Sequence, residues 1–281
     1  MSLEQRFHSL EDFLTSTASD VDGTLNDGWG YPFPVKGCEL EATVLFADIT
    51  AFSSRTSDMS PAATLVYVQN FFAWITAEAL HGRPGIVDKY IGDEMMIVYS
   101  TAFGSSDPLL DAVRAALAMS RHDVLSYCPH IGIASGRVII GHVGTPLRYS
   151  VSAFGAPVAL AARCASVRPP DDDEHLISSS IVMPACEWVG RNMSEAFDGP
   201  RPELLGEVTS DFDGFEVQVP RLVPLMGIGD TEVVEVYNRG MHLPWQSAED
   251  RARDGLFALY KSNRYWPRWD APEPGEAHSV A

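Results

Sequence analysis

The sequence predicts an α+β fold of the ferredoxin-like type, in which an antiparallel-rich sheet carries helices on one face. A short apolar strand at residues 44–49 is followed by a helical pattern and then by a hairpin at residues 86–99. A second helical pattern and further strands come next. This βαββαβ-like order of strand, helix and hairpin is the main support for the predicted fold class.

The first half of the predicted domain has clear start and turn signals. Ser60 followed by Pro61 predicts a helix start, because serine caps the free amides and proline fits the first helical position. Apolar residues at helical spacing from Leu65 to Ala79 predict one buried stripe. Gly92 and Asp93 then predict the turn of the hairpin.

The second half repeats this order. Asp107 opens a second predicted helix, and residues 131–134 and 138–143 predict another hairpin joined at Ser135 and Gly136. A strand around residues 149–152 leads into a third helix. The whole chain is predicted to divide into an N-terminal arm (1–38), a catalytic-type domain (39–240) and a C-terminal helical tail (241–281).

Composition limits the classes of function. The chain has 281 residues, of which 46% are hydrophobic, and this is enough for a sizeable core. The formal net charge of -18 disfavours binding to nucleic acid, whose phosphates would be repelled. No apolar stretch is long enough for a membrane span. The scattered cysteines predict free thiols in a reducing cytoplasm, so we expect a cytoplasmic protein; they are Cys38, Cys128, Cys164 and Cys186.

Two aspartates end predicted strands. Asp48 follows the apolar strand, and Asp93 lies in the hairpin turn. A carboxylate at the end of a buried strand is costly to desolvate unless a cation lies beside it. Mg²⁺ and Mn²⁺ prefer oxygen ligands and act together with substrate phosphates. Taken singly, Asp48 is better explained as a helix cap and Asp93 as an ordinary turn residue, but the pair predicts a site for one or two such ions.

Four ordered segments carry a family resemblance. They are residues 46–49, 85–93, 136–144 and 155–163, and they resemble the signature segments of the class III nucleotide cyclases in order and spacing. The resemblance covers about residues 40 to 238. It implies a metal-dependent enzyme that converts a nucleoside triphosphate into a 3′,5′-cyclic nucleotide and pyrophosphate.

The resemblance also implies roles for the metal and phosphate groups. Asp48 and Asp93, with the carbonyl of Ile49, would hold two Mn²⁺ or Mg²⁺ ions per active site. Arg163 would act on the transferring phosphate, since a guanidinium fork suits that charge. The β- and γ-phosphates would be received by the backbone amides of Thr50, Ala51 and Phe52.

The positions that would contact the base are unusual. Lys89 and Ser152 match the two base-contacting positions of the family, and Phe46 is a candidate wall of the base pocket. Lysine with aspartate or threonine accompanies adenine in that family, and glutamate with cysteine accompanies guanine. Lysine with serine therefore argues against GTP and resembles the adenine set without reproducing it.

Two further positions depart from the family pattern. Ala159 stands where the family has an asparagine that stabilises the transition state, and loss of such a donor costs about two orders of magnitude in rate. The family's triphosphate-binding lysine is replaced by Met226 or Ile228.

Several functions stay open at this point. The preferred one is a pyrimidine cyclase that makes cyclic UMP or cyclic CMP, as in the bacterial antiphage Pycsar systems, with the product bound by a separate cyclic-nucleotide-binding effector. The alternatives are an adenylate cyclase and a decayed cyclase-like binding domain. In the family the active site lies between two domains paired head to tail, so the resemblance implies a homodimer with sites at its interface.

Overall fold

The computed structural model describes residues 6–20, 36–121, 123, 127–145, 148–168, 179–189, 193–197, 210–212 and 215–238. The described elements, in chain order, are α1 (Leu10–Thr17), β1 (Ser19–Asp20), β2 (Lys36–Asp48), α2 (Phe52–Thr56), α3 (Pro61–Leu80), β3 (Gly85–Ile91), β4 (Glu94–Tyr99), the 3-10 helix η2 (Thr101–Phe103), α4 (Pro108–Arg121), β5 (His130–Thr145), β6 (Arg148–Phe154), α5 (Ala156–Ala165), β7 (Ser180–Pro184), α6 (Ala185–Val189), the 3-10 helix η4 (Met193–Ala196), β8 (Ser210–Phe212), β9 (Phe215–Val217), β10 (Arg221–Leu225) and β11 (Gly229–Asn238).

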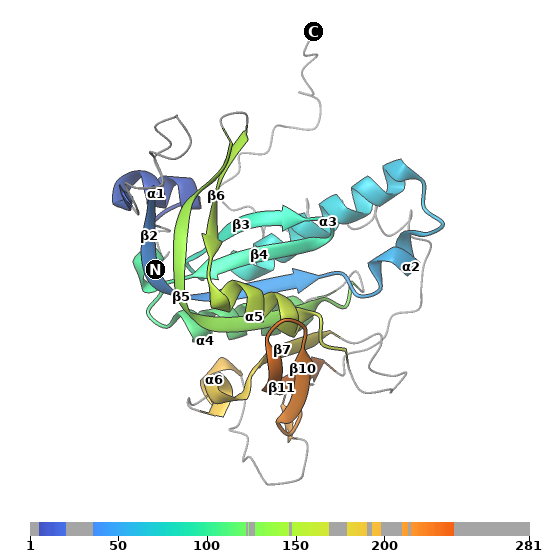
Figure 1. Cartoon of the computed structure of the whole chain (residues 1–281). Helices are drawn as coiled ribbons and strands as arrows, with labels where there is room; N and C mark the ends of the chain where they lie inside the picture. Colours follow the sequence, from blue (N-terminus) through green and yellow to red (C-terminus); the bar gives the residue numbers. More distant parts are fainter. Residues whose placement is uncertain are drawn as a thin grey trace.

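One mixed sheet forms the centre of the molecule (Figure 1). Its strands run in the order β3-β4-β2-β5-β7-β11-β9-β8, with β6 paired to β5 and β10 paired to β11. Among the described strands only β5 and β7 pair in parallel. The predicted α+β class with an antiparallel-rich sheet is therefore confirmed.

Alternate residues of the central strands point to opposite faces of this sheet. Leu45 and Ala47 of β2 pack in a core with α3 and α4. Val44 and Phe46 pack in a second core with α1 and α5. The expectation of helices on one face is therefore wrong, because each face has its own apolar set and each set is covered.

Helix α3 begins where the sequence predicts, since the Ser60 side chain accepts a hydrogen bond from the amide of Ala63. Its buried stripe differs from the prediction. Leu65 is 70% exposed, whereas Phe71 and Trp74 are fully buried. The first turns of α3 extend past the strands of the sheet, so their apolar residues have no core to contact (Figure 1).

The predicted hairpin at Gly136 is also wrong, because β5 is a single strand. It pairs with β2 continuously from His130 to Gly141, on both sides of Gly136. Serine–glycine pairs favour turns, but this uninterrupted ladder holds the backbone extended. The strand that pairs with the end of β5 is β6, in register Ile139 to Phe154.

Helix α5 lies directly against β5 at Gly132. A Cβ atom at this position would overlap the backbone of Ala161 and Ala165 in the last turns of α5. Only glycine permits this approach. The contact fixes where the chain leaves α5, and therefore where Arg168 lies.

The predicted arm is partly described: Leu10, Phe13 and Leu14 of α1 are buried against the sheet. The predicted tail lies outside the described residues, and the domain boundaries stay a prediction. The four cysteines are free. No helix in the described ranges is long and apolar enough to cross a bilayer.

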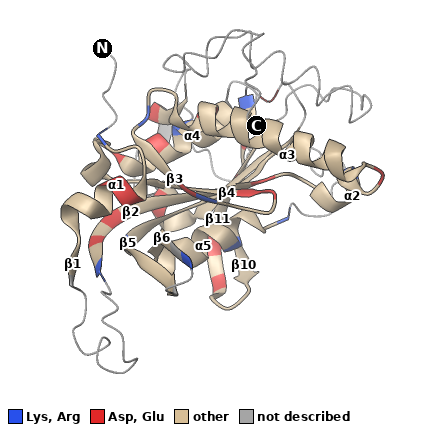
Figure 2. Cartoon of the chain, turned by 90° about the horizontal axis from the view of Figure 1, so that it is seen from above, with Lys and Arg blue, Asp and Glu red and all other residues tan. Residues whose placement is uncertain are grey.

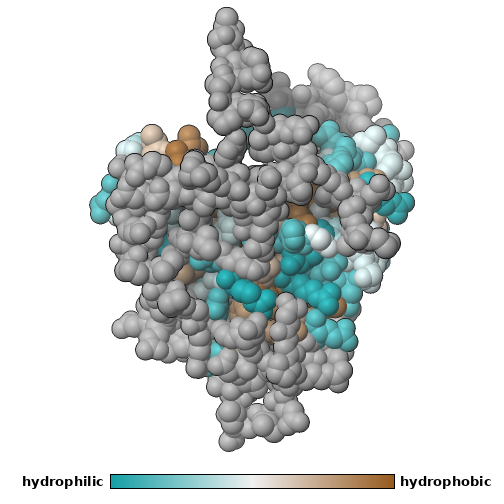
Figure 3. All heavy atoms as spheres, turned by 180° about the vertical axis from the view of Figure 1, so that it is seen from behind, coloured by the Kyte–Doolittle hydropathy of each residue, from teal (hydrophilic) through white to brown (hydrophobic). Residues whose placement is uncertain are grey.

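The described surface is mostly hydrophilic on the rear face, with small hydrophobic areas (Figure 3). Acidic side chains are spread over several elements and outnumber basic ones (Figure 2). This distribution fits the net charge of -18 and shows no continuous basic surface among the described residues.

Candidate active site

Asp48 lies at the end of β2, as the sequence predicts. Its side chain is 22% exposed. Burial raises the pKa of Asp48 to about 7, and the nearby charge of Arg168 opposes this shift. The Oδ1 atom is buried and has no hydrogen-bond partner among the described residues. A buried carboxylate oxygen without a donor is the environment that a bound cation would stabilise.

Asp93 lies beside Asp48 although 45 residues separate them in sequence. The backbone amide of Ile49, which directly follows Asp48, lies close enough to the Asp93 carboxylate to lower its pKa. Burial raises the pKa of Asp93. Repulsion from Asp93 also contributes to the raised pKa of Asp48. The structure therefore brings the two predicted carboxylates together, and both fit a hard divalent cation.

The described residues contain no group of three or more His, Cys, Asp and Glu side chains that would hold a metal. The predicted donor set needs only two carboxylates and one carbonyl. The Ile49 carbonyl accepts a hydrogen bond from Phe52 N–H at 3.3 Å. A carbonyl has a second lone pair, so this bond still leaves room for a metal ligand.

The loop after Asp48 is a tight turn. The Thr50 hydroxyl donates to the Cys128 carbonyl, and Thr50 is buried. Ala51 has a left-handed backbone, with φ of 54°. The Phe52 amide already donates to Ile49. The predicted phosphate-binding role of the three amides stays a prediction, and Phe52 N–H can take part only if this turn opens.

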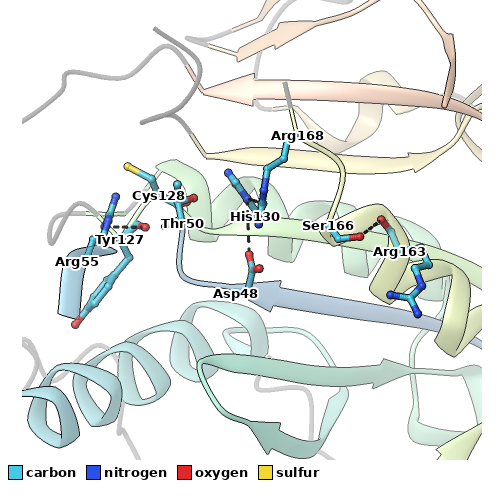
Figure 4. Close-up of polar contacts among 9 residues, drawn as sticks. All are labelled: Asp48, Thr50, Arg55, Tyr127, Cys128, His130, Arg163, Ser166 and Arg168. Carbon is cyan, nitrogen blue, oxygen red and sulfur yellow. Dashed lines mark hydrogen bonds and ion pairs between the residues drawn. The ribbon is translucent and has the colours of Figure 1, made fainter. Parts of the chain in front are cut away.

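Sequence reasoning missed two residues beside Asp48. His130 is the direct partner of Asp48 across β2 and β5, with 3.9 Å between His130 Nδ1 and Asp48 Oδ1. Arg168 donates a hydrogen bond to His130 Nδ1. Figure 4 shows the Arg168 side chain meeting the His130 ring above Asp48. The available signal was that His130 begins an apolar strand, which an antiparallel neighbour places opposite the end of β2.

His130 is neutral in this arrangement. Burial, together with the charges of Arg168 and Arg55, lowers the pKa of His130 to about 3. Because arginine only donates, His130 Nδ1 must be the acceptor. The contact of His130 with Asp48 is therefore not an ion pair, in spite of the short distance.

Arg163 lies on α5, and its side chain lies apart from Asp48 (Figure 4). Its charge acts on Glu94, whose pKa is raised by burial and lowered in part by Arg163. The cation that acts on both Asp48 and Asp93 is Arg168. Within one chain, the structure does not bring Arg163 to the two carboxylates.

The predicted base contacts meet at a third residue, Asp88. The Ser152 hydroxyl donates to Asp88 Oδ2 at 2.7 Å. The Lys89 ammonium lies 3.8 Å from the same oxygen and 5.7 Å from the centre of the Phe154 ring. Burial raises the pKa of Asp88, and the bond from Ser152 opposes this.

The three residues predicted to contact the base differ in their exposure to solvent. The Lys89 side chain is 37% exposed, whereas Ser152 is fully buried. Phe46 is 4% exposed and belongs to the core, so it offers no surface to a base. Its interpretation as a pocket wall is therefore corrected, because its position in β2 directs it under α5.

Solved structures of nucleotide cyclases share this fold. One is the guanylyl cyclase Cya2, with a TM-score of 0.50 and 21% identity over 75% of this chain and 98% of that chain. Another is the adenylyl cyclase CyaB from P. aeruginosa, with a TM-score of 0.51 and 18% identity over 74% of this chain and 98% of that chain. Identities of this size establish the fold and leave the substrate open.

A comparison with protein-family models gives the same result as the comparison of folds. Residues 38–172 match the model of the adenylate and guanylate cyclase catalytic domain. The match covers just under half of the chain, and it shows that this part of the chain is similar to that catalytic domain.

Curated relatives are similar over the same domain. The uncharacterized proteins Rv1319c and Rv1320c of Mycobacterium tuberculosis are 28% identical over 154 residues and 31% identical over 158 residues. Each alignment covers 54% of this chain but only 29% and 27% of the two relatives. The chain therefore spans less than a third of the length of these relatives.

Proposed function

We propose that the protein converts a nucleoside triphosphate into a 3′,5′-cyclic nucleotide and pyrophosphate. The observation that carries this proposal is the proximity of Asp48 and Asp93 at adjoining strand ends, where the charge of Asp93 raises the pKa of Asp48. Such a pair has little purpose in a fold without a cation, since burial disfavours both charges.

In the proposed reaction the ribose 3′-oxygen bonds to the α-phosphorus while the bond from the α-phosphorus to the bridging oxygen of pyrophosphate breaks. The 3′-hydroxyl proton leaves to solvent, and pyrophosphate carries away the electron pair. Asp48 and Asp93, with the Ile49 carbonyl, would hold Mn²⁺ or Mg²⁺. When bound, such ions supply Lewis-acid activation of the hydroxyl and neutralise phosphate charge. The protein itself orients the substrate, which already contains its own nucleophile.

The proposal includes a homodimer. Arg163 lies apart from Asp48 within one chain (Figure 4), so a site that contains both groups calls for a second subunit. A two-fold axis would place the Arg163 of each subunit against the carboxylates of the other and would form two equal sites.

A pyrimidine is the preferred base. Ser152 is buried and its hydroxyl donates to Asp88, so Lys89 is the more accessible of the two predicted base contacts. A lysine ammonium only donates hydrogen bonds. The O2 carbonyl of uracil and of cytosine and the O4 carbonyl of uracil can accept such a bond, whereas adenine offers only ring nitrogens; the amino groups of adenine and of cytosine both need a separate acceptor. This supports a uridylate or cytidylate cyclase, with ATP as the alternative because the adenine N1 atom would also accept from Lys89.

The decisive experiment is incubation of the purified full chain with Mn²⁺ and each of the four nucleoside triphosphates. We expect cyclic UMP or cyclic CMP as the main product, measured by chromatography and mass spectrometry. Cyclic AMP as the only product would replace the pyrimidine proposal by the adenylate one. No cyclic product from any triphosphate would favour a binding domain, for which the exposed Ala159 on α5 is the supporting feature.

Ser152→Ala tests whether the serine contacts the base. We expect the variant to keep the wild-type preference among triphosphates and to lose about 1–3 kcal/mol of stability, since the buried Asp88 carboxylate loses a donor. Thermal unfolding and the product ratio measure the two effects. A changed base preference at unchanged stability would show that Ser152 contacts the base.

We further propose that the cyclic nucleotide acts as a second messenger in antiphage defence. This role requires a separate effector that binds the cyclic nucleotide. A gene for such an effector beside the gene for this protein would support it.

A further inference from the structure

Arg168 has two anchors that fix it over the paired carboxylates. Its guanidinium donates to Nδ1 of His130, whose side chain is 3% exposed. Its backbone carbonyl accepts a hydrogen bond from Arg221 Nη2 at 3.2 Å. One anchor comes from the strand beside Asp48 and the other from the β10–β11 hairpin.

Arg221, which supplies the second anchor, is itself held by hydrogen bonds to a buried residue. Arg221 Nε donates to Glu235 Oε1 at 2.8 Å. Glu235 is 2% exposed and also accepts a hydrogen bond from the Tyr237 hydroxyl. The backbone at Arg168 is therefore connected to a buried polar network, although the residue itself is exposed.

The charge of Arg168 is not cancelled by its hydrogen bond. Its acceptor, His130, is neutral, whereas a guanidinium in a salt bridge would have its charge neutralised. Arginine has five N–H donors in a fork that matches phosphate oxygens. The charge of Arg168 therefore acts on Asp48 and Asp93, and its remaining N–H donors can bind a phosphate when a cation offsets the two carboxylates.

The chain lacks a cation at the other expected place. Met226 and Ile228, which stand where the family resemblance implies a triphosphate lysine, are 71% and 44% exposed in the turn between β10 and β11. Neither side chain can donate to a phosphate.

We propose that Arg168 binds the β- and γ-phosphates of the substrate in the same subunit as Asp48 and Asp93, and that His130 is the positioning residue that orients it. This inference rests on the proposed function and goes beyond it by assigning a phosphate-binding residue. The reaction needs a cation here, because the departing pyrophosphate carries the developing negative charge.

The test measures binding of inorganic pyrophosphate with Mn²⁺ to the full chain by titration calorimetry. We expect Arg168→Gln to weaken binding about 10- to 100-fold, as for the loss of a charged hydrogen bond, and Arg168→Lys to weaken it less. His130→Leu should weaken binding too, and its effect should not add to that of Arg168→Gln because both act on one contact. The matched control is Arg137→Gln, which removes an exposed arginine on the same strand as His130.

The outcomes separate this inference from the proposed function. Wild-type pyrophosphate affinity in a folded Arg168→Gln variant would overturn the inference. The inference would also be overturned if Arg168→Gln bound Mn²⁺ more tightly and pyrophosphate as well as wild type does. Arg168 would then only neutralise the two carboxylates. If pyrophosphate binding depends on Arg168 but no triphosphate is cyclised, the inference stands and the proposed function fails.

Discussion

Replacing Asp93 by alanine is expected to lower cyclic nucleotide formation by about 1,000-fold or more. Metal-ion catalysis supplies several kcal/mol of transition-state stabilisation, and each 1.36 kcal/mol is a factor of ten in rate. Asp48→Asn should have an effect of similar size, because the two carboxylates lie together and repel each other. The measurement is the initial rate with Mn²⁺ and the preferred triphosphate.

Stability separates loss of catalysis from loss of folding in these variants. Burial raises the pKa of Asp48 to about 7, so the charged side chain opposes folding when no cation is bound. The metal-free Asp48→Asn variant should therefore unfold at the wild-type temperature or above it. Glu39→Gln is the matched control, because Glu39 is an exposed carboxylate on the same strand that pairs with Arg137. Activity above a tenth of wild type in Asp93→Ala would rule out the paired-carboxylate site.

Local signals in the sequence were enough for the elements that end at a turn or a cap. The Ser60 cap of α3 and the Gly92 turn of the β3–β4 hairpin are formed by neighbouring residues, so their chemistry is visible in a few letters. The continuous strand β5 was not predictable in this way. Its extension through Gly136 depends on pairing with β2, which lies far away in the sequence.

The residues of the candidate site also differ in whether local sequence could predict their positions. The positions of Asp48 and Asp93 could be predicted because each stands at the end of a strand with a clear pattern, and their role as metal ligands stays a prediction. Arg168 could not, since it is brought to Asp48 by the packing of α5 on Gly132 and by the bond from Arg221. The burial of Phe46 and Ser152 could not be predicted either. The sequence suggested that helices cover one face of the sheet, whereas both faces are covered.

Gly132→Ala is expected to destabilise the fold by about 3 kcal/mol or more, near the upper end of overpacking costs. The added Cβ would overlap the backbone of Ala161 and Ala165, and it would lie 2.9 Å from the Ala165 Cα atom. Backbone atoms inside a helix cannot rotate away as a side chain can, so α5 must move as a unit. For a domain of this size the unfolding temperature should fall by about 10 °C.

The same displacement should also impair catalysis, because α5 carries Arg163 and leads directly to Arg168. Gly82→Ala is the control: its φ is 69°, but a Cβ there would meet no atom within 4 Å, so only the backbone strain of about 1 kcal/mol is expected. If both variants lost the same small amount of stability, α5 would not be in close contact with β5. Arg168 would then have no fixed position over Asp48, and the phosphate-binding role would lose its structural basis.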